Sequence, residues 1–298
     1  MKRLILALLL LAPLAPAHAA LNVFACEPEW AALVAELAGE RAKVYSATTA
    51  RQDPHRIEAR PSLIARVRRA DLVVCTGAEL EIGWLPLLLR QAGNARVQPG
   101  QAGYFEAAAV VERLDVPTTV DRAMGDVHAS GNPHVHTDPR RIARIAEHLS
   151  ARLAGLDPAN AQAYRDRLAD FSRRWSEALD RWSARAAPLR GVRVVAHHKD
   201  WVYLYEWLGM ESAGYLEVKP GIPPSAAHLA ALKVELAAQP ARLVLRTPYQ
   251  DPRASEWLAQ QTGVVPVELP YTAGGTPGTA DLFGLVEVTV ERLLAGLQ

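Results

Sequence analysis

Two kinds of hydrophobic pattern alternate along the first half of the chain. Short apolar runs predict strands, and stretches in which apolar side chains recur every three or four positions predict helices. The strands are expected at 21–25, 43–47, 71–75 and, more weakly, 95–98, and the helices at 28–38, 61–69 and 84–91. An irregular stretch follows as far as residue 125.

The same alternation returns in the second half. The predicted strands lie at 192–196, 243–245 and 264–268, and the predicted helices at 201–208, 225–236, 254–261 and 280–297. Strands that alternate with helices in both halves predict an α/β protein with two Rossmann-like α/β lobes and mostly parallel sheets. Ligands of such sheets bind beyond the carboxyl ends of the strands.

Two helices between the halves begin with an Asp-Pro pair, at Asp138-Pro139 and at Asp157-Pro158. Aspartate is a good N-cap and proline suits the first helical position. The second helix runs towards residue 188, and about 29 residues at 1.5 Å each span roughly 43 Å, so it is long enough to join both halves as a rigid link. We therefore expect an N-terminal lobe at residues 21–156, a linking helix at 157–187 and a C-terminal lobe at 188–298.

Residues 1–20 have the features of a secretory signal peptide. Lys2 and Arg3 precede an apolar run at 4–14, which is too short to span a bilayer, and small residues follow up to Ala19 and Ala20. Removing Lys2 and Arg3 lowers the count of Lys and Arg from 33 to 31 against 32 Asp and Glu, a formal charge of −1. We expect a soluble, monomeric protein in the periplasm or another extracytoplasmic space, without nucleic acid as a partner.

Cys26 and Cys75, the two cysteines of the chain, each stand at the end of a predicted strand. Neighbouring parallel strands would bring these ends together, and the expected compartment permits disulfides. We hypothesise a Cys26–Cys75 disulfide; two buried thiols are the alternative.

Histidines collect at the expected ligand-binding edges. His55 follows the second strand, His134 lies just before the helix capped by Asp138, and His197-His198 follow the strand at 192–196. Because both halves contribute, a shared site would lie in the cleft between the lobes. Neutral imidazole is a common ligand of zinc and other transition metals, so the pattern indicates a metal site, although loop histidines are often merely solvated.

An exported metal-dependent hydrolase is the enzymatic alternative. The sequence contains neither H-E-x-x-H nor G-x-S-x-G, and only Glu58 and Asp200 stand near the histidines as a candidate acid or base. We therefore expect a binding protein and not an enzyme.

Several motifs resemble those of the zinc- and manganese-binding solute-binding proteins of ABC importers, the ZnuA/TroA-like family. They are D-P-H-R-I-E-A-R-P-S at 53–62, A-D-L-V-V-C-T-G-A-E-L-E at 70–81, N-P-H-V-H-T-D-P at 132–139 and H-K-D-W-V-Y-L from His198. The resemblance implies two α/β lobes joined by one long helix. It also implies that His55, His134 and His198 are the metal ligands, favours His198 over His197, and assigns no ligand role to His136.

The sequence departs from this family in the fourth ligand. Many members supply a carboxylate shortly before the last helix, where this chain reads L-P-Y-T-A-G-G-T-P-G-T. His128, a water molecule or Asp281 could complete the site, in that order.

Three imidazole nitrogens favour zinc, since manganese prefers more oxygen ligands. The resemblance implies that Zn²⁺ is carried to an ABC permease in the inner membrane. An importer component for manganese or iron is the alternative, and related folds also serve as adhesins or metal buffers. Because imidazole must be neutral to bind metal, affinity should fall as the pH drops through the usual histidine pKa of about 6.5.

Overall fold

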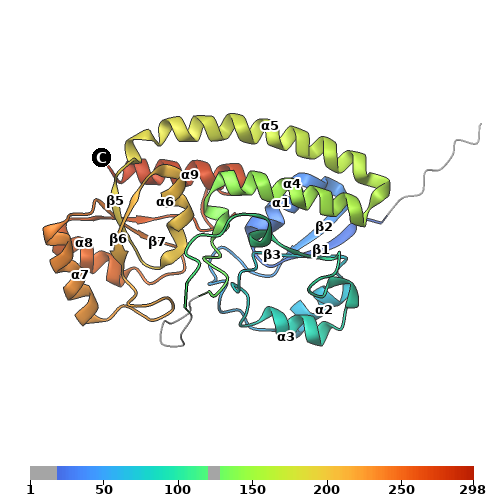
Figure 1. Ribbon diagram of the computed structural model, residues 1–298, viewed down its shortest axis with the longest axis horizontal. Coiled ribbons are helices and arrows are strands. Elements are labelled where there is room, and N and C mark those ends of the chain that lie inside the picture. The colour runs from blue at the N-terminus through green and yellow to red at the C-terminus, as the bar shows by residue number, and fades with distance from the viewer. Residues whose placement is uncertain (1–18, 120–127) are drawn as a thin grey trace, which may run out of the picture.

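The computed structural model describes residues 19–119 and 128–298 and contains two four-stranded sheets. Their strand orders are β2-β1-β3-β4 and β6-β5-β7-β8, and every pairing between these strands is parallel. The two sheets lie side by side along the molecule, and helix α5 runs along one side of both (Figure 1). The predicted fold class, two parallel α/β lobes with a long helix, is confirmed. Most of the predicted signal peptide lies outside the described residues.

The first sheet is built from the N-terminal half of the chain. Its strands are β1 (Leu21–Ala25), β2 (Ala42–Ser46), β3 (Leu72–Cys75) and β4 (Tyr104–Glu106), and the helices between them are α1 (Pro28–Ala38), α2 (Pro61–Arg69) and α3 (Leu85–Ala92). All four residues of the central strand β3 are buried, as expected for a continuous apolar run covered on both faces.

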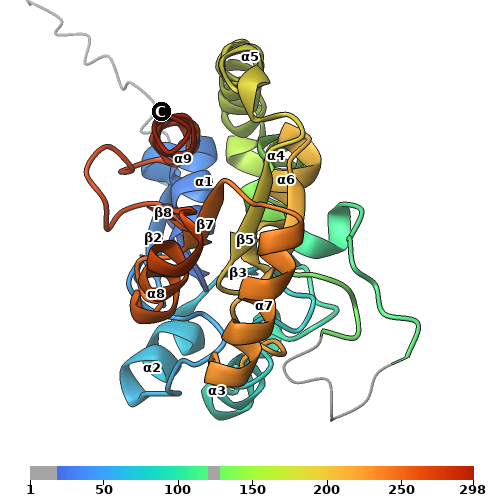
Figure 2. The same ribbon diagram turned by 90° about the vertical axis from the view of Figure 1, so that its left-hand side faces the viewer.

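The second sheet comes from the C-terminal half. Its strands are β5 (Arg193–Ala196), β6 (Glu211–Tyr215), β7 (Leu243–Arg246) and β8 (Val265–Glu268), and its helices are α6 (Val202–Leu208), α7 (Ala226–Ala238), α8 (Arg253–Thr262) and α9 (Leu282–Ala295). Seen from the end of the molecule, α5 lies on the opposite side from α2 and α3 (Figure 2).

One strand prediction, at 95–98, was wrong, and two strands, β4 and β6, were not predicted. Residues Ala95–Val97 form a 3-10 helix, because the Asn94 side chain accepts from the backbone N–H of Arg96 and caps a turn there, and the fourth strand is β4 instead. Strand β6 was missed. Its sequence, E-S-A-G-Y, has no apolar run from which a strand could be predicted. The strand lies at the edge of the sheet and is partly exposed, so its side chains need not be apolar.

The helices between the lobes begin differently. Asp138 caps α4 (Pro139–Leu156) as predicted, and its carboxylate accepts from the backbone N–H of Arg140 at 2.8 Å. Asp157 makes no such cap: its carboxylate accepts from the Tyr164 hydroxyl at 2.8 Å, and a 3-10 turn at Pro158–Asn160 comes before α5 (Ala161–Arg185). The regular part of the long helix therefore has 25 residues.

Helix α5 is held to the last helix by aromatic side chains. Phe171, Trp175 and Trp182 are buried, and the Phe283 ring of α9 packs against all three, with its centroid 4.8 Å from that of Trp175. The aromatic stripe is therefore core. No helix among the described residues combines the length and the apolar character that a bilayer-spanning helix requires.

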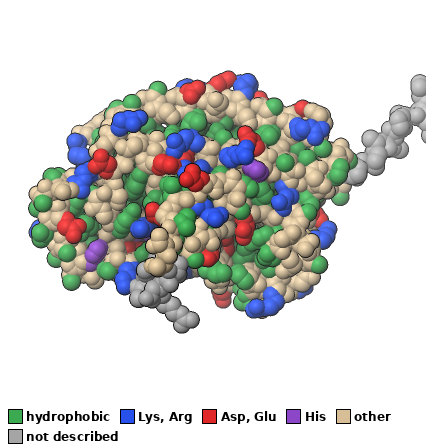
Figure 3. Space-filling view, viewed as in Figure 1, with side chains coloured by type: hydrophobic (Ala, Val, Ile, Leu, Met, Phe, Trp, Pro, Cys, Tyr) green, Lys and Arg blue, Asp and Glu red, His purple; other side chains and the backbone are tan. Residues whose placement is uncertain are grey.

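The predicted disulfide is present. Cys26 and Cys75 are bonded, with their Cα atoms 4.8 Å apart, at the ends of the neighbouring strands β1 and β3. On the face shown in Figure 3, cationic and anionic side chains are interspersed, in keeping with the near-zero net charge.

Candidate metal centre

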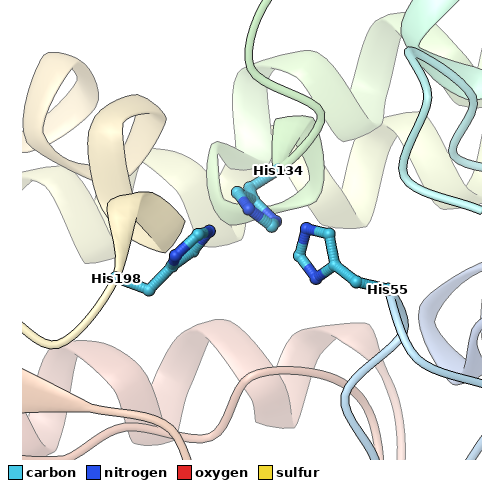
Figure 4. A group of neighbouring side chains, drawn as sticks. All are labelled: His55, His134 and His198. Atoms are coloured by element: carbon cyan, nitrogen blue, oxygen red, sulfur yellow. The ribbon is translucent and has the colours of Figure 1, made fainter. Parts of the chain in front are cut away.

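Three imidazoles from separate segments point towards one another between the lobes (Figure 4). His55 lies on the loop between β2 and α2, His134 lies just before α4, and His198 follows β5. One ring nitrogen of each lies within 4.8 Å of the others. His134 is fully buried, His198 is 8% exposed, and His55 is partly buried. The structure thus brings together the three side chains that the sequence singled out.

Each of the three rings is oriented through Nδ1. The Nδ1 atom of His55 lies 2.8 Å from a carboxylate oxygen of Asp53, and that of His198 lies 2.7 Å from a carboxylate oxygen of Glu217. The Nδ1 atom of His134 lies 2.8 Å from the hydroxyl of Tyr271. Metal-binding histidines are commonly held in this way, with one nitrogen hydrogen-bonded and the other facing the ion.

The Nε2 atoms, on the other side of the rings from Nδ1, are buried and free of hydrogen bonds in two of the three histidines. The Nε2 atoms of His55 and His134 are buried and have no hydrogen-bond partner. A buried nitrogen without a partner is costly, and few such atoms occur in a folded protein. The two atoms therefore mark a place prepared for a ligand.

The loop that carries His55 is fixed by local hydrogen bonds. The Asp53 carboxylate accepts from the backbone N–H of His55 at 3.0 Å, which closes an Asx turn around Pro54. The indole N–H of the buried Trp84 donates to the Pro54 carbonyl at 2.9 Å. This tryptophan therefore supports the loop from the lobe interior.

Burial and neighbouring charges set the protonation of the histidines. Burial, helped by His55 and His198, holds the pKa of His134 well below its usual value, so that ring is neutral. Burial lowers the pKa of His198 too, but the carboxylates of Asp200 and Glu217 outweigh it, and the net pKa is raised. In the metal-free protein, His198 therefore holds a proton more readily than His134 does.

The structure separates the candidates for a fourth ligand. The His128 ring centroid lies 5.3 Å from that of His55, and its buried Nε2 has no hydrogen-bond partner. Burial lowers the pKa of His128 to about 3, so this ring is neutral as well. Asp281 is exposed and caps α9, where its carboxylate accepts from the backbone N–H of Gly284 at 2.8 Å. The Asp281 carboxylate therefore serves as the N-cap of α9.

One carboxylate near the histidines was not predicted as a ligand. Asp200 is fully buried, and one of its oxygens, Oδ1, lies 3.8 Å from Nε2 of His134. In the sequence, only its position two residues after His198 places Asp200 near the candidate site. The sequence suggests it as a candidate acid or base and not as a metal ligand.

Two further histidines, His136 and His228, make contacts outside the cluster of three. His136 bridges the lobes: its Nε2 lies 2.9 Å from the carbonyl of Tyr271, and its Nδ1 lies 3.5 Å from the Glu29 carboxylate. His228 lies against the Tyr215 carbonyl at 2.9 Å. Neither ring is part of the cluster of three.

A cavity of about 690 Å³ opens beside the cluster. Both lobes line it, the first with His55 and Arg56 and the second with His198, Tyr249 and Trp257. The Arg56 guanidinium donates to the Gly221 carbonyl at 3.1 Å and so connects the lobes at the cavity wall. Two of the three clustered histidines, His55 and His198, therefore border this cavity, whereas His134 lines a separate cavity of about 100 Å³.

The sequence places the chain among known proteins. Residues 23–296 match the family ZnuA, described as zinc-uptake complex component A, periplasmic. The chain belongs to the ZnuA family. This family comprises substrate-binding components of ABC transporters, which confirms the expectation that the chain is not an enzyme.

Individual relatives are distant. The high-affinity zinc uptake system protein ZnuA of Yersinia pestis is 23% identical over 232 residues, which cover 71% of this chain and 70% of that protein. The manganese ABC transporter substrate-binding lipoprotein PsaA of Streptococcus pneumoniae is 24% identical over 188 residues, covering 61% of this chain and 57% of that protein. A crystal structure of ZnuA superposes with a TM-score of 0.79 at 20% identity and covers 94% of this chain and 100% of that one, which shows a shared fold.

Proposed function

We propose that this protein captures Zn²⁺ between its lobes with the imidazoles of His55, His134 and His198 and delivers the ion to an ABC permease in the inner membrane. The observation that carries the proposal is the convergence of three oriented imidazoles from both lobes, two of them with a buried Nε2 that has no hydrogen-bond partner. Zinc is the cargo in this proposal and not a resident cofactor.

The donor set favours zinc. Three neutral imidazoles suit a tetrahedral zinc site, whereas manganese prefers more oxygen ligands. Membership of a family described by zinc uptake supports the same metal. Manganese is the second candidate, because two relatives are named for manganese transport.

The geometry also supports a simple capture mechanism. The ion would enter through the cavity between the lobes and bind to the three Nε2 atoms, while Asp53, Tyr271 and Glu217 keep the rings in place. We propose that the protein acts as an exported monomer, with lobes at residues 21–156 and 188–298 joined through residues 157–187.

The metal itself can be tested directly. Protein purified without chelators should contain about one zinc per chain, and competition titration should rank zinc above manganese. A preference for manganese at equal exposure would contradict the zinc assignment.

The ligand assignment needs a variant. His134→Ala should weaken zinc binding by about 100-fold or more, because it removes one of three donors to the ion. His148→Ala, on helix α4 and apart from the cluster, is the matched control and should leave the affinity unchanged. Equal zinc affinity in both variants would remove His134 from the site.

A further inference from the structure

We propose that Asp200 is a fourth metal ligand and supplies the single oxygen donor from protein in this site. The inference rests on the proposed function, since it concerns the same ion. It gives a role to a residue that lies in a different part of the second lobe from 269–279, where the related proteins were expected to carry a carboxylate.

The first observation is that one oxygen of Asp200 has no partner. The side chain is fully buried, and Oδ1 makes no hydrogen bond. The other oxygen, Oδ2, accepts from the side-chain amide of Gln250 at 2.9 Å, which holds the carboxylate in one orientation. A carboxylate taken out of water needs compensation at both oxygens, and a bound cation is the natural source for the free one.

The second observation is where that oxygen lies. Oδ1 of Asp200 is 3.8 Å from Nε2 of His134, which is also buried without a partner. That separation is too long for a hydrogen bond. It is about half an ångström longer than the roughly 3.3 Å expected between two ligand atoms on a tetrahedral zinc with bonds near 2.0–2.1 Å. Asp200 does not belong to the group of side chains whose candidate ligand atoms all lie within 4.8 Å of one another, so its carboxylate would have to move towards His55 and His198 to join them on one ion.

The third observation concerns the backbone. Asp200 and His198 are separated by one residue, at the carboxyl end of β5 and the start of a 3-10 helix spanning Lys199–Trp201. The side chain of Trp201 is buried and anchors this short segment. One rigid segment of the second lobe would therefore present both a nitrogen and an oxygen donor.

Charge distinguishes Asp200 from His128 as the fourth ligand. Three neutral imidazoles leave the full double charge of the ion in a buried site, and a fourth neutral imidazole would not reduce it. The Asp200 carboxylate halves the net charge, which lowers the cost of burying the ion. An oxygen donor also makes the site less selective against manganese than nitrogen alone.

The test is Asp200→Asn, which keeps the shape and an oxygen that can accept from Gln250 but removes the charge. Zinc affinity, measured by competition with a chelator, should fall by about 30-fold, and manganese affinity should fall by more. The visible absorption of the Co²⁺-loaded protein should change, because a ligand to the ion has been altered. Asp251→Asn is the matched control, since Asp251 lines the cavity near the cluster and its carboxylate is already paired with Arg253.

The outcomes separate this inference from the proposed function. If Asp200→Asn retains zinc affinity within about twofold and an unchanged cobalt spectrum while His134→Ala loses binding, Asp200 is not a ligand and the proposed function stands. If His134→Ala also binds normally, the proposed function itself fails.

A measurement on the unmodified protein covers the case in which the variant does not fold. X-ray absorption of the zinc-loaded protein distinguishes imidazole from carboxylate by the scattering of the outer ring atoms. Three imidazoles with one carboxylate oxygen would support Asp200. Four imidazoles would overturn the inference in favour of His128.

Discussion

The two lobes repeat one arrangement at the carboxyl ends of their central strands. In the first lobe the backbone N–H of Cys26 donates to the carbonyl of Val74 at 2.8 Å, across β1 and β3. In the second lobe the N–H of His197 donates to the carbonyl of Leu245 at 2.8 Å, across β5 and β7. Cys26 and His197 therefore occupy equivalent positions.

The hydrogen bonds on the other side of Cys26 and His197 show the same equivalence between the lobes. The N–H of Thr48 donates to the Cys26 carbonyl at 3.2 Å, and the N–H of Glu217 donates to the His197 carbonyl at 3.1 Å. Thr48 is thus the counterpart of Glu217, whose carboxylate orients His198. The backbone at the two edges is nearly the same, so the difference between them must come from side chains.

The side chains at the two edges differ in what they contact. The first edge is closed by the disulfide, and the buried carboxylates of Glu27 and Glu81 both lie against Thr76 just beyond it. The second edge presents His198 to the cleft. The same backbone arrangement therefore provides two equivalent edges: Cys26 closes the first with a disulfide, and His198 extends from the second towards the candidate site.

The largest expected effect is at the second edge. His198→Ala should weaken zinc binding by about 1,000-fold, or about 4 kcal/mol, because it removes the only imidazole proposed to bind from this lobe. His197→Ala changes the adjacent residue, at the position equivalent to Cys26, and should alter the affinity by less than about threefold. Isothermal titration or chelator competition measures both. A greater loss in His197→Ala than in His198→Ala would reverse the assignment.

The next effect concerns the first edge. Reducing the disulfide, which joins residues 49 positions apart, should lower the free energy of unfolding by about 3 kcal/mol, because the unfolded chain gains freedom. Denaturant unfolding with and without reductant measures the change. Cys26 and Cys75 are the only cysteines in the sequence, so the reductant can act at this edge alone. Zinc affinity should change by less than about threefold, and a large loss would show that the two edges are coupled.

The smallest effect is a pH dependence of the first edge. Burial raises the pKa of Glu81 to about 7, above its ordinary 4.5, so the folded protein favours the protonated form. The resulting stability is fully present below the unfolded pKa and is lost as the pH rises through the folded pKa. Between pH 5 and pH 8 the loss should be roughly 2 kcal/mol.

Glu81→Gln tests this prediction, because glutamine imitates the protonated acid. Unfolding free energies of the variant should depend less on pH over the same range than those of the unmodified protein. An unchanged pH dependence would show that Glu81 does not titrate there. The exposed Glu177, on helix α5, provides the control substitution Glu177→Gln.

Much of the architecture could be predicted from local patterns. The buried strand β3 is an uninterrupted apolar run, and Asp138-Pro139 marks the start of α4 because capping depends on neighbouring residues only. The positions of Cys26 and Cys75 at the ends of predicted strands were enough to suggest their pairing. Strand β6 was missed because it is an edge strand stabilised by its partner β5 and has no apolar signal of its own.

Some features of the candidate site likewise follow from the sequence, and others only from the tertiary structure. The sequence by itself determined that histidines follow strands in both halves, and a resemblance in motifs selected His55, His134 and His198 among them. Only the tertiary structure decided which nitrogen of each ring faces the cleft, because Asp53, Tyr271 and Glu217 take the other one.

The choice among candidates for a fourth metal ligand required the tertiary structure. The sequence offers Asp281 as a candidate fourth ligand, but its carboxylate caps α9. Asp200, which the sequence suggests only as a candidate acid or base, has a buried oxygen near Nε2 of His134. Local patterns determine where strands and helices begin, because backbone hydrogen bonds and caps involve near neighbours. The direction of a buried side chain is decided by packing between elements far apart in the chain, so only the tertiary structure could place the side chains of the candidate site.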